Sequence, residues 1–96
     1  MVKVKFEWDD NKDEENLAKH HVRFVDAQAA FSDPHRIIAR DLGHSDTEER
    51  FYCFGQVQGG VLTVRFTYRR QVIRIIGAGY WRKGKAAYEK ENNLHR

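Results

Sequence analysis

The second half of this sequence is rich in arginine and has few acidic residues to neutralise it. Arg50, Arg65, Arg69 and Arg74 lie close together in the chain, and residues 51–85 contain no Asp or Glu. Guanidinium groups form paired hydrogen bonds with phosphate and carboxylate oxygens. The formal charge of the whole chain is +3, which favours polyanions and acidic proteins as partners. We therefore expect these arginines to mark the place where the protein acts on a partner.

Side chains that can move protons accompany the arginines. RNA can be cleaved without a metal ion when its 2′-hydroxyl attacks the adjacent phosphate, a reaction that needs a base, an acid and a cation. Lys19 would add positive charge at such a site. The residues that could bind the phosphate are Arg50, Arg69 and Arg74. The residues that could transfer protons are His20, His44 and Glu48.

Each proton-transfer candidate also has an ordinary structural interpretation. His20 is followed by His21, and because successive helical residues point about 100° apart, at most one of them can face a site. A surface histidine without a role is at least as good an interpretation. His44 is equally well explained as a turn residue that bonds the backbone, and Glu48 as part of an ion-paired loop end. The sequence leaves open which of them, if any, transfers a proton.

The sequence predicts no metal, no cofactor and no membrane segment. The five histidines and the single Cys53 lack the spacing of zinc ligand sets, and nothing resembles a glycine-rich phosphate loop. One cysteine cannot form an internal disulfide, and we expect Cys53 to act as a small buried hydrophobic residue. No apolar run is long enough to cross a bilayer. A reducing cytoplasm is the expected location.

The 96 residues can close one hydrophobic core, so we expect a single domain spanning 1–96. Apolar spacing, capping residues and turn signals predict its elements. In chain order they are a strand over 2–8, a helix from 9 or 10 to about 20, a short helix from Asp26 to Asp33-Pro34, strands over 36–41, 50–58, 61–69 and 72–78, and a helix over about 83–93. The two N-terminal helices should form a hairpin packed on one face of an antiparallel sheet, and the short C-terminal helix should be loosely attached. The predicted fold class is α+β.

The last three strands are joined by two short turns, Gly59-Gly60 and Arg70-Gln71. Two-residue turns would pair Phe54 with Arg65, Tyr52 with Thr67, Arg50 with Arg69, and Thr67 with Arg74. Alternation then gives the sheet an apolar face, which carries Phe51, Cys53, Val57, Leu62, Val64, Phe66, Ile73 and Ile75. The opposite face, called the basic face below, carries Arg50, Tyr52, Phe54, Thr63, Arg65, Thr67, Arg69 and Arg74.

The basic face interleaves guanidinium groups with aromatic rings, a combination that binds single-stranded RNA through its phosphates and stacked bases. Tyr52, Arg65 and Thr67 are therefore expected to contact RNA. Like charges directly opposite each other are mildly destabilising, so Arg50 facing Arg69 suggests that an anion belongs there. A solvated sheet face, or a surface for an acidic protein, would explain the same pattern.

Several short motifs, in order along the chain, resemble the BrnT family of toxins. In the first half they are Phe6-Glu7-Trp8-Asp9, Lys12, Asn16, Lys19-His20, Val22, Phe24, Ala27 and Phe31-Ser32-Asp33-Pro34. In the second half they are His44-Ser45, Glu48-Glu49-Arg50, Gly55, Thr67-Tyr68-Arg69 and Ile73-Arg74-Ile75-Ile76. The resemblance spans most of the chain, up to about Ala78.

This resemblance implies a RelE-like fold and an endoribonuclease that inhibits translation, acting as the toxin of a type II toxin–antitoxin pair. The implied partners are RNA and a BrnA-like antitoxin. That antitoxin would be a ribbon-helix-helix protein, and the chain would meet operator DNA only through it. The strands and helices expected from the sequence agree with this fold.

One departure from the family pattern falls at the end of the last predicted strand. Where the family usually continues Ser-Ala-Arg, this chain has Gly77-Ala78-Gly79. The missing arginine would remove a phosphate ligand or a transition-state contact, if it has such a role. Either Arg82 or Lys83 then substitutes for it in binding RNA, or this copy cleaves weakly. The alternatives are a nucleic-acid-binding module without chemistry and a module that only receives the antitoxin.

Overall fold

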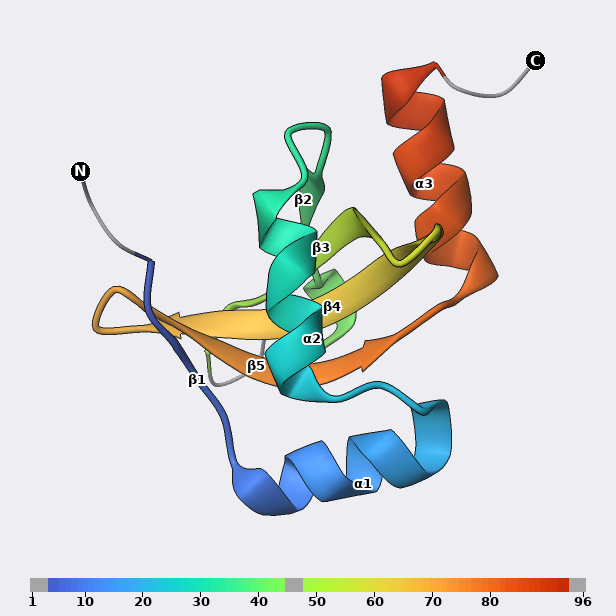
Figure 1. The fold of residues 1–96 in the computed structure, drawn as a ribbon. Helices are drawn as coiled ribbons and strands as arrows, with labels where there is room; N and C mark the ends of the chain where they lie inside the picture. The colour runs from blue at the N-terminus through green and yellow to red at the C-terminus, as the bar shows by residue number, and fades with distance from the viewer. Residues whose placement is uncertain (1–3, 45–47, 94–96) are drawn as a thin grey trace.

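The computed structural model describes residues 4–44 and 48–93, which are built around a twisted sheet (Figure 1). Within those residues the sheet has five strands in the order β1-β5-β4-β3-β2. The strands are β1 (Phe6–Glu7), β2 (Ile37–Arg40), β3 (Arg50–Val57), β4 (Gly60–Arg69) and β5 (Val72–Gly79). The helical segments are α1 (Asp10–His20), α2 (Phe24–Ala27), η1 (Gln28–Ser32), η2 (Leu42–His44) and α3 (Arg82–Asn92). The predicted α+β class is confirmed, and the beginning of the expected first strand, at Val2, lies outside the described residues.

The first hairpin, between β3 and β4, turns one residue earlier than the sequence suggested. Its central residues are Gln58 and Gly59, and both have positive φ, 51° and 84°. This is the backbone of a type I′ turn, whose twist matches that of paired strands. The second hairpin turns at Arg70 and Gln71 as predicted, with φ of 52° and 68°.

The earlier turn shifts the pairing of β3 with β4 by two residues. The observed cross-strand pairs are Arg50–Thr67, Tyr52–Arg65 and Phe54–Thr63. The predicted pairing of Arg50 with Arg69 is therefore wrong, and the repulsion inferred from it does not arise. Thr67 lies opposite Arg74 across the second hairpin, as predicted. Because side-chain direction repeats every second residue, a shift of two leaves each residue on its predicted face.

The strand β1 makes the sheet mixed rather than antiparallel. Phe6 pairs with Ile73 and Glu7 with Arg74 in a parallel arrangement. A parallel pair needs a long crossover connection, and the chain between β1 and β5 supplies it. The alternation of the opening residues predicted a strand but carried no information about its direction. One consequence is that Glu7 stands beside Arg74 at the edge of the basic face.

One face of the sheet is sealed by α2 and η1 (Figure 1). The buried residues of this core are Val22, Phe24, Ala27, Ala30, Cys53, Val57, Leu62, Val64, Phe66, Ile73, Ile75 and Ala78, with Phe51 packed against them. The predicted apolar face is confirmed. A Cβ at Gly55 would collide with the backbone of Ala30, so this glycine lets η1 lie directly on β3. Burial raises the pKa of the Cys53 thiol to about 12, in keeping with its expected apolar role.

The first helix begins at the predicted cap, and the second does not. The Asp9 carboxylate accepts the Asn11 N–H at 2.8 Å and caps α1. The helix α2 begins at Phe24, before the predicted cap Asp26, because the Phe24 N–H donates to the Asp13 carboxylate of α1 at 2.8 Å. A cap supplied by another helix cannot be recognised in the local sequence. Since α1 contacts β5 while η1 packs chiefly on β3, the expected helical hairpin is not confirmed.

One buried polar residue fixes α1 to the sheet. Asn16 donates from Nδ2 to the carbonyl oxygens of Val22 and Ala78, each at 2.9 Å, and its Oδ1 accepts the Ala78 N–H at 3.1 Å. These bonds satisfy an amide that would otherwise be costly to bury. Asn16 is the buried residue of α1, so the helix lies on the surface as predicted.

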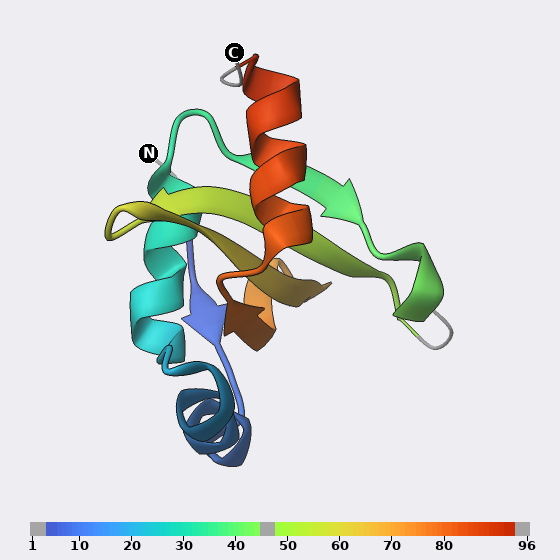
Figure 2. The same ribbon diagram turned by 90° about the vertical axis from the view of Figure 1, so that its right-hand side faces the viewer.

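The helix α3 lies on the opposite side of the sheet from α2, over β3 and β4 (Figure 2). Its Tyr88 is 2% exposed and packs with Phe54 and Val61. The Tyr88 hydroxyl donates to the Asp33 carboxylate at 2.7 Å. The prediction of a loosely attached helix is therefore wrong. A polar, Lys-rich sequence concealed one aromatic anchor whose partner is distant in the chain.

The carboxylate of Asp33 receives several hydrogen bonds at once. Burial alone would raise its pKa, but bonds from the Gln56 N–H, the Tyr88 hydroxyl and the His35 N–H, with the charge of His35, bring it below its ordinary value of 3.8. Burial and the bond to Asp33 raise the pKa of Tyr88 to about 12. The fold therefore favours an ionised Asp33 and a neutral Tyr88, which anchor α3 together.

Candidate functional site

The basic face is arranged as cross-strand rows that follow one another along the sheet away from α3. The row nearest α3 is Phe54, Thr63 and Gly79, the next is Tyr52, Arg65 and Gly77, and the third is Arg50, Thr67, Arg74 and Glu7. Neighbouring strands lie about 4.8 Å apart, and same-face residues along one strand about 7 Å apart. Arg50 and Arg74 therefore flank Thr67, with Arg65 one row away. Three guanidinium side chains rise from a small area of the sheet.

An extra residue in β5 sets what stands beside Arg65. Ile75 pairs with Phe66 and Gly77 pairs with Arg65, so Ile76 forms a β-bulge. Without the bulge, Ile76 would face Arg65. A Cβ added at Gly77 would lie 4.0 Å from the Arg65 guanidinium, which therefore extends across the glycine toward α1.

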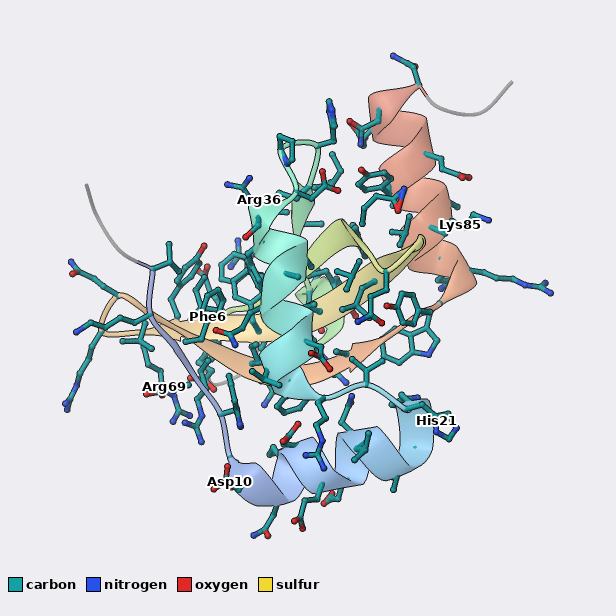
Figure 3. All side chains as sticks on the ribbon, viewed as in Figure 1. Phe6, Asp10, His21, Arg36, Arg69 and Lys85 are labelled. Carbon is teal, nitrogen blue, oxygen red and sulfur yellow. The ribbon has the colours of Figure 1, made fainter. Side chains whose placement is uncertain are left out.

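The Arg65 guanidinium reaches a groove between α1 and the sheet. The groove has a volume of about 190 Å³ and is lined by Lys12, Glu15, Asn16, Lys19, His20, Arg65, Ile76, Gly77 and Trp81. The predicted site residues Lys19 and His20 therefore line the same groove as Arg65. The His20 ring packs edge-on against Trp81, with ring centroids 5.0 Å apart. His21 is the left-handed C-cap residue, with φ of 60°, and lies at the outer end of α1 (Figure 3).

A larger pocket lies on the basic face beneath the start of α3. It has a volume of about 520 Å³ and is lined by Tyr52, Phe54, Thr63, Arg65, Trp81, Lys83 and Gly84. Arg65 and Trp81 line both cavities, which are therefore neighbours. Lys83, one of the two residues expected to compensate for Gly79, lines this pocket. Arg82, the other, lines a different pocket together with Tyr80 and Trp81.

The arginines of the basic face differ in whether a carboxylate holds them. Arg69 pairs with Glu48 at 3.3 Å, and Arg74 pairs with Glu7 at 3.0 Å. Arg65 forms no ion pair within the described part of the chain. Arg69 lies toward the β4–β5 turn, at the opposite end of the molecule from the end of α1 (Figure 3). The structure therefore does not bring Glu48 into the groove that holds Arg65.

The remaining predicted site residues have distinct environments. Thr67 is 2% exposed, and its hydroxyl donates to the Glu49 carbonyl at 2.6 Å, so the hydroxyl proton is used within the fold. Arg50 is half-buried beside it. His44 ends η2, and its side chain lies outside the described part of the structure.

Tyr52 links the basic face to its aromatic pocket. Its ring stacks on Phe54 with centroids 5.8 Å apart and planes 17° from parallel. Burial raises the pKa of Tyr52, as do the charge of Asp41 and a hydrogen bond to it, while the charge of Arg65 lowers it. The phenol is therefore held neutral, and Tyr52 is one of the residues that line the pocket.

Gly79 has a structural reason of its own. A Cβ at this position would lie 2.5–2.8 Å from three atoms of the Trp81 indole. The ring fills the space that a side chain at position 79 would take, so an arginine there would displace it. In this chain the departure from the family pattern accommodates an indole that is 39% exposed.

The sequence reasoning missed Trp81, Lys12 and Glu15 as residues of the groove. Lys12, Glu15 and Lys19 are separated by three and four positions, which places them on one helical face, and this signal was present in the sequence. Trp81 gave no comparable signal. Its position depends on the space left at Gly79 and on the approach of α1.

The cationic groups that line the groove are Lys12, Lys19 and Arg65. In residues 4–44 and 48–93, no three His, Cys, Asp or Glu side chains gather in a way that could hold a metal ion. Over the same residues, no helix has both the length and the apolar character of a membrane span.

The fold and the site define an α+β domain whose arginine-bearing sheet face adjoins a groove. The groove is lined by a histidine, two lysines and an arginine that has no ion pair within residues 4–44 and 48–93. Such a protein is equipped to bind a polyanion. The family described as "Ribonuclease toxin, BrnT, of type II toxin-antitoxin system" matches residues 8–84. The chain belongs to this family, which confirms the resemblance seen in its motifs. The matched segment contains the residues that line the groove and the larger pocket. A comparison with curated proteins finds no match.

Proposed function

We propose that this chain is an endoribonuclease toxin that cleaves RNA in the groove between α1 and the sheet, without using a metal ion. One observation carries the proposal most directly. Arg65 forms no ion pair with a described residue and meets Lys19 and His20 in the groove. A cation without a carboxylate partner is available for a phosphate, and membership of a ribonuclease family supports RNA as its source.

The reaction is an attack of the RNA 2′-hydroxyl on the adjacent phosphorus. The hydroxyl loses its proton, O2′ bonds to phosphorus, and the bond from phosphorus to O5′ breaks. The products are a 2′,3′-cyclic phosphate and a 5′-hydroxyl that has gained a proton. Arg65 and Lys19 stabilise the charge that grows on the phosphate oxygens, and His20 transfers a proton.

The outer arginines hold the RNA backbone beyond the reacting phosphate. Arg50 and Arg74 are half-buried on either side of the buried Thr67, and Arg69 lies farther along β4. Glu7 and Glu48 now hold Arg74 and Arg69 at 3.0 and 3.3 Å. RNA phosphates would compete with these exposed carboxylates, so RNA affinity should fall steeply as salt concentration rises.

Membership of a toxin family supports a proposal for the biological setting. The toxin acts in the cytoplasm, where RNA cleavage inhibits translation. A BrnA-like antitoxin with a ribbon-helix-helix domain neutralises it and contacts operator DNA. Lys83 compensates for the missing arginine at Gly79, because it lines the pocket that shares Arg65 with the groove.

Two adjacent histidines provide the matched test. His20→Asn should reduce the rate of cleavage of a single-stranded RNA by about 10²–10⁴-fold, the usual contribution of a proton-transfer residue. His21→Asn is the control, because Asn tolerates the left-handed backbone at that position. Purified proteins would be assayed with EDTA present, and RNA ends would be analysed for a 2′,3′-cyclic phosphate.

Other outcomes separate this proposal from its alternatives. If the unaltered protein binds RNA but leaves it intact, and cells expressing it alone grow normally, the chain is a binding module without chemistry. If RNA is neither bound nor cleaved, only the protein-interaction function stands. Equal cleavage by the two histidine variants would remove His20 from the mechanism.

A further inference from the structure

The pocket beneath the start of α3 contains a polar atom with no partner. Thr63 is 4% exposed and lines this pocket, and its Oγ1 has no hydrogen-bond partner among the described residues. Leaving a buried hydroxyl unsatisfied is unfavourable, and native proteins contain few such groups. Thr67, four residues farther along the same strand, shows the usual arrangement, since its hydroxyl donates to the Glu49 carbonyl. Thr63 is therefore the exception on β4.

The close approach of α3 to Thr63 depends on Gly84. A Cβ at position 84 would collide with Thr63 Oγ1 and would also press on the Phe54 ring. Glycine is a poor helix former, and Gly84 stands in the first turn of α3. Its presence has a packing reason, because it allows the first turn of the helix to lie over the unpartnered hydroxyl.

The start of α3 offers hydrogen-bond donors to the same pocket. Its N-cap residue, Trp81, makes no side-chain cap bond within the described residues. The N–H groups of the first helical turn have no acceptor inside the helix, and such groups bind phosphate well. Lys83 and Gly84 belong to this turn and line the pocket. Lys83 adds an ammonium group to the backbone donors.

Aromatic rings form the walls of the pocket. Tyr52 and Phe54 are stacked on each other on the sheet side, and Trp81 lies at the border with the groove. Aromatic side chains bind nucleic-acid bases by stacking. The volume of about 520 Å³ falls within the range of about 300–1,000 Å³ typical of small-ligand sites. The pocket thus combines stacking surfaces, phosphate donors and one unsatisfied hydroxyl.

We propose that this pocket binds one nucleotide of the RNA, next to the phosphate held by Arg65 in the groove. The base stacks between Trp81 and Tyr52, and a phosphate lies at the first turn of α3 beside Lys83. The Thr63 side chain rotates so that its hydroxyl, which Gly84 covers in this structure, hydrogen-bonds to the nucleotide. This assignment rests on the proposed ribonuclease function for its substrate. It goes further by giving the protein a subsite that can favour one base, and so set where the RNA is cut.

The test uses Trp81 as a reporter. The chain contains two tryptophans, so in a Trp8→Phe background the fluorescence comes from Trp81 alone. Each of the four ribonucleoside monophosphates would be titrated in, and we expect saturable quenching that is strongest for one base. Thr63→Val, which keeps the shape and removes the hydroxyl, should weaken binding about tenfold, as should Lys83→Ala. Lys90→Ala, which removes the same charge from the last turn of α3, should bind as the background does.

Three results would overturn the assignment. They are the absence of saturable quenching, equal quenching by inorganic phosphate alone, and unchanged nucleotide binding by a folded Thr63→Val protein. RNA cleavage by the same proteins keeps this idea separate from the proposed function. Thr63-dependent nucleotide binding with intact RNA would support the subsite and reject the nuclease. RNA cleavage with an unchanged pattern in Thr63→Val would reject the subsite and retain the nuclease.

Discussion

The two faces of the sheet are formed by the same strands, but they differ in how far helices cover them. On one face, α2 and η1 cover a continuous set of apolar side chains, and Phe66 and Leu62 are fully buried there. On the other, α3 packs on Phe54 and Val61, and Arg65 and Arg74 farther along the sheet are only half-buried. The strands thus hold a sealed core on one side and display cations on the other.

This difference separates the residues that stabilise the fold from those that act on a partner. Alternation along β4 places Phe66 and Arg65 next to each other in sequence but on opposite faces. A change to one should therefore affect stability, and a change to the other should affect RNA. A variant of either residue that changes both the stability of the fold and the cleavage of RNA would contradict this separation.

The largest expected effect comes from the sealed face. Phe66 is fully buried and packs against the rings of Phe31, Phe51 and Tyr68. Phe66→Ala should lower the free energy of unfolding by about 3–5 kcal/mol, because it removes a large buried ring and leaves a cavity. Urea unfolding would measure the loss. A loss below about 1 kcal/mol would mean that this face is not the main source of stability.

The anchor of α3 should have the next largest effect. Tyr88→Phe removes the hydroxyl that donates to Asp33 at 2.7 Å while keeping the ring. Hydrogen bonds to charged groups contribute about 1.5–3 kcal/mol, and urea unfolding should show a loss of that size. An unchanged free energy of unfolding would restore the idea of a loosely attached helix.

Alkaline pH should weaken the same anchor. The pKa of Tyr88 is about 12 in the folded protein, against an ordinary value of 10 in the unfolded chain. Its contribution is therefore complete below pH 10 and is lost as pH rises to about 12, with a loss of about 1.4 kcal/mol at about pH 11. Cys53 acts in the same direction, since burial raises its thiol pKa from 9.0 to about 12. Urea unfolding of Tyr88→Phe should show only the Cys53 part, and an identical pH dependence would contradict this assignment.

The smallest expected effects come from the two threonines of β4, one with a hydrogen-bonded hydroxyl and one without a partner among the described residues. Thr67→Val removes a hydroxyl that is bonded to the Glu49 carbonyl and should lower the free energy of unfolding by about 1 kcal/mol. Thr63→Val removes an unpartnered hydroxyl and should leave that free energy unchanged or raise it by up to about 1 kcal/mol. Thermal unfolding of both variants would give the signs. Destabilisation by both would mean that the Thr63 hydroxyl has a structural partner.

The sequence predicted the faces better than it predicted the register. Alternation separated Phe66 from Arg65 whichever turn joined the strands, because a shift of two residues does not change a face. The position of the turn depended on whether Gln58 or Gly60 joined Gly59, and two glycines in a row left that choice open. The direction of β1 and the anchoring of α3 depended on distant partners, Ile73 and Asp33, which local patterns do not identify.

The sequence also predicted which residues belong to the candidate site, but not how they come together. Strand periodicity predicts that the arginines share one face. The predicted end of the first helix places Lys19 and His20 next to each other there. Their meeting with Arg65 depends on the bulge at Ile76 and on Trp81 filling the space above Gly79. Those are packing outcomes, and they appear only when the sheet and α1 are assembled.

The central claim is that Arg65, which forms no ion pair with a described residue, acts on RNA and does little for stability. The most direct measurement compares the rates of RNA cleavage by Arg65→Ala and Arg40→Ala. Arg40 belongs to the same sheet and pairs with Phe51 of the apolar face, so its side chain lies on the other face from Arg65. Arg65→Ala should cleave RNA about 10²-fold more slowly than the unaltered protein. Its free energy of unfolding should stay within about 0.5 kcal/mol of that protein's. Arg40→Ala should cleave RNA at the normal rate. Cleavage by Arg65→Ala at the unaltered rate, or an equal loss in both variants, would contradict the account.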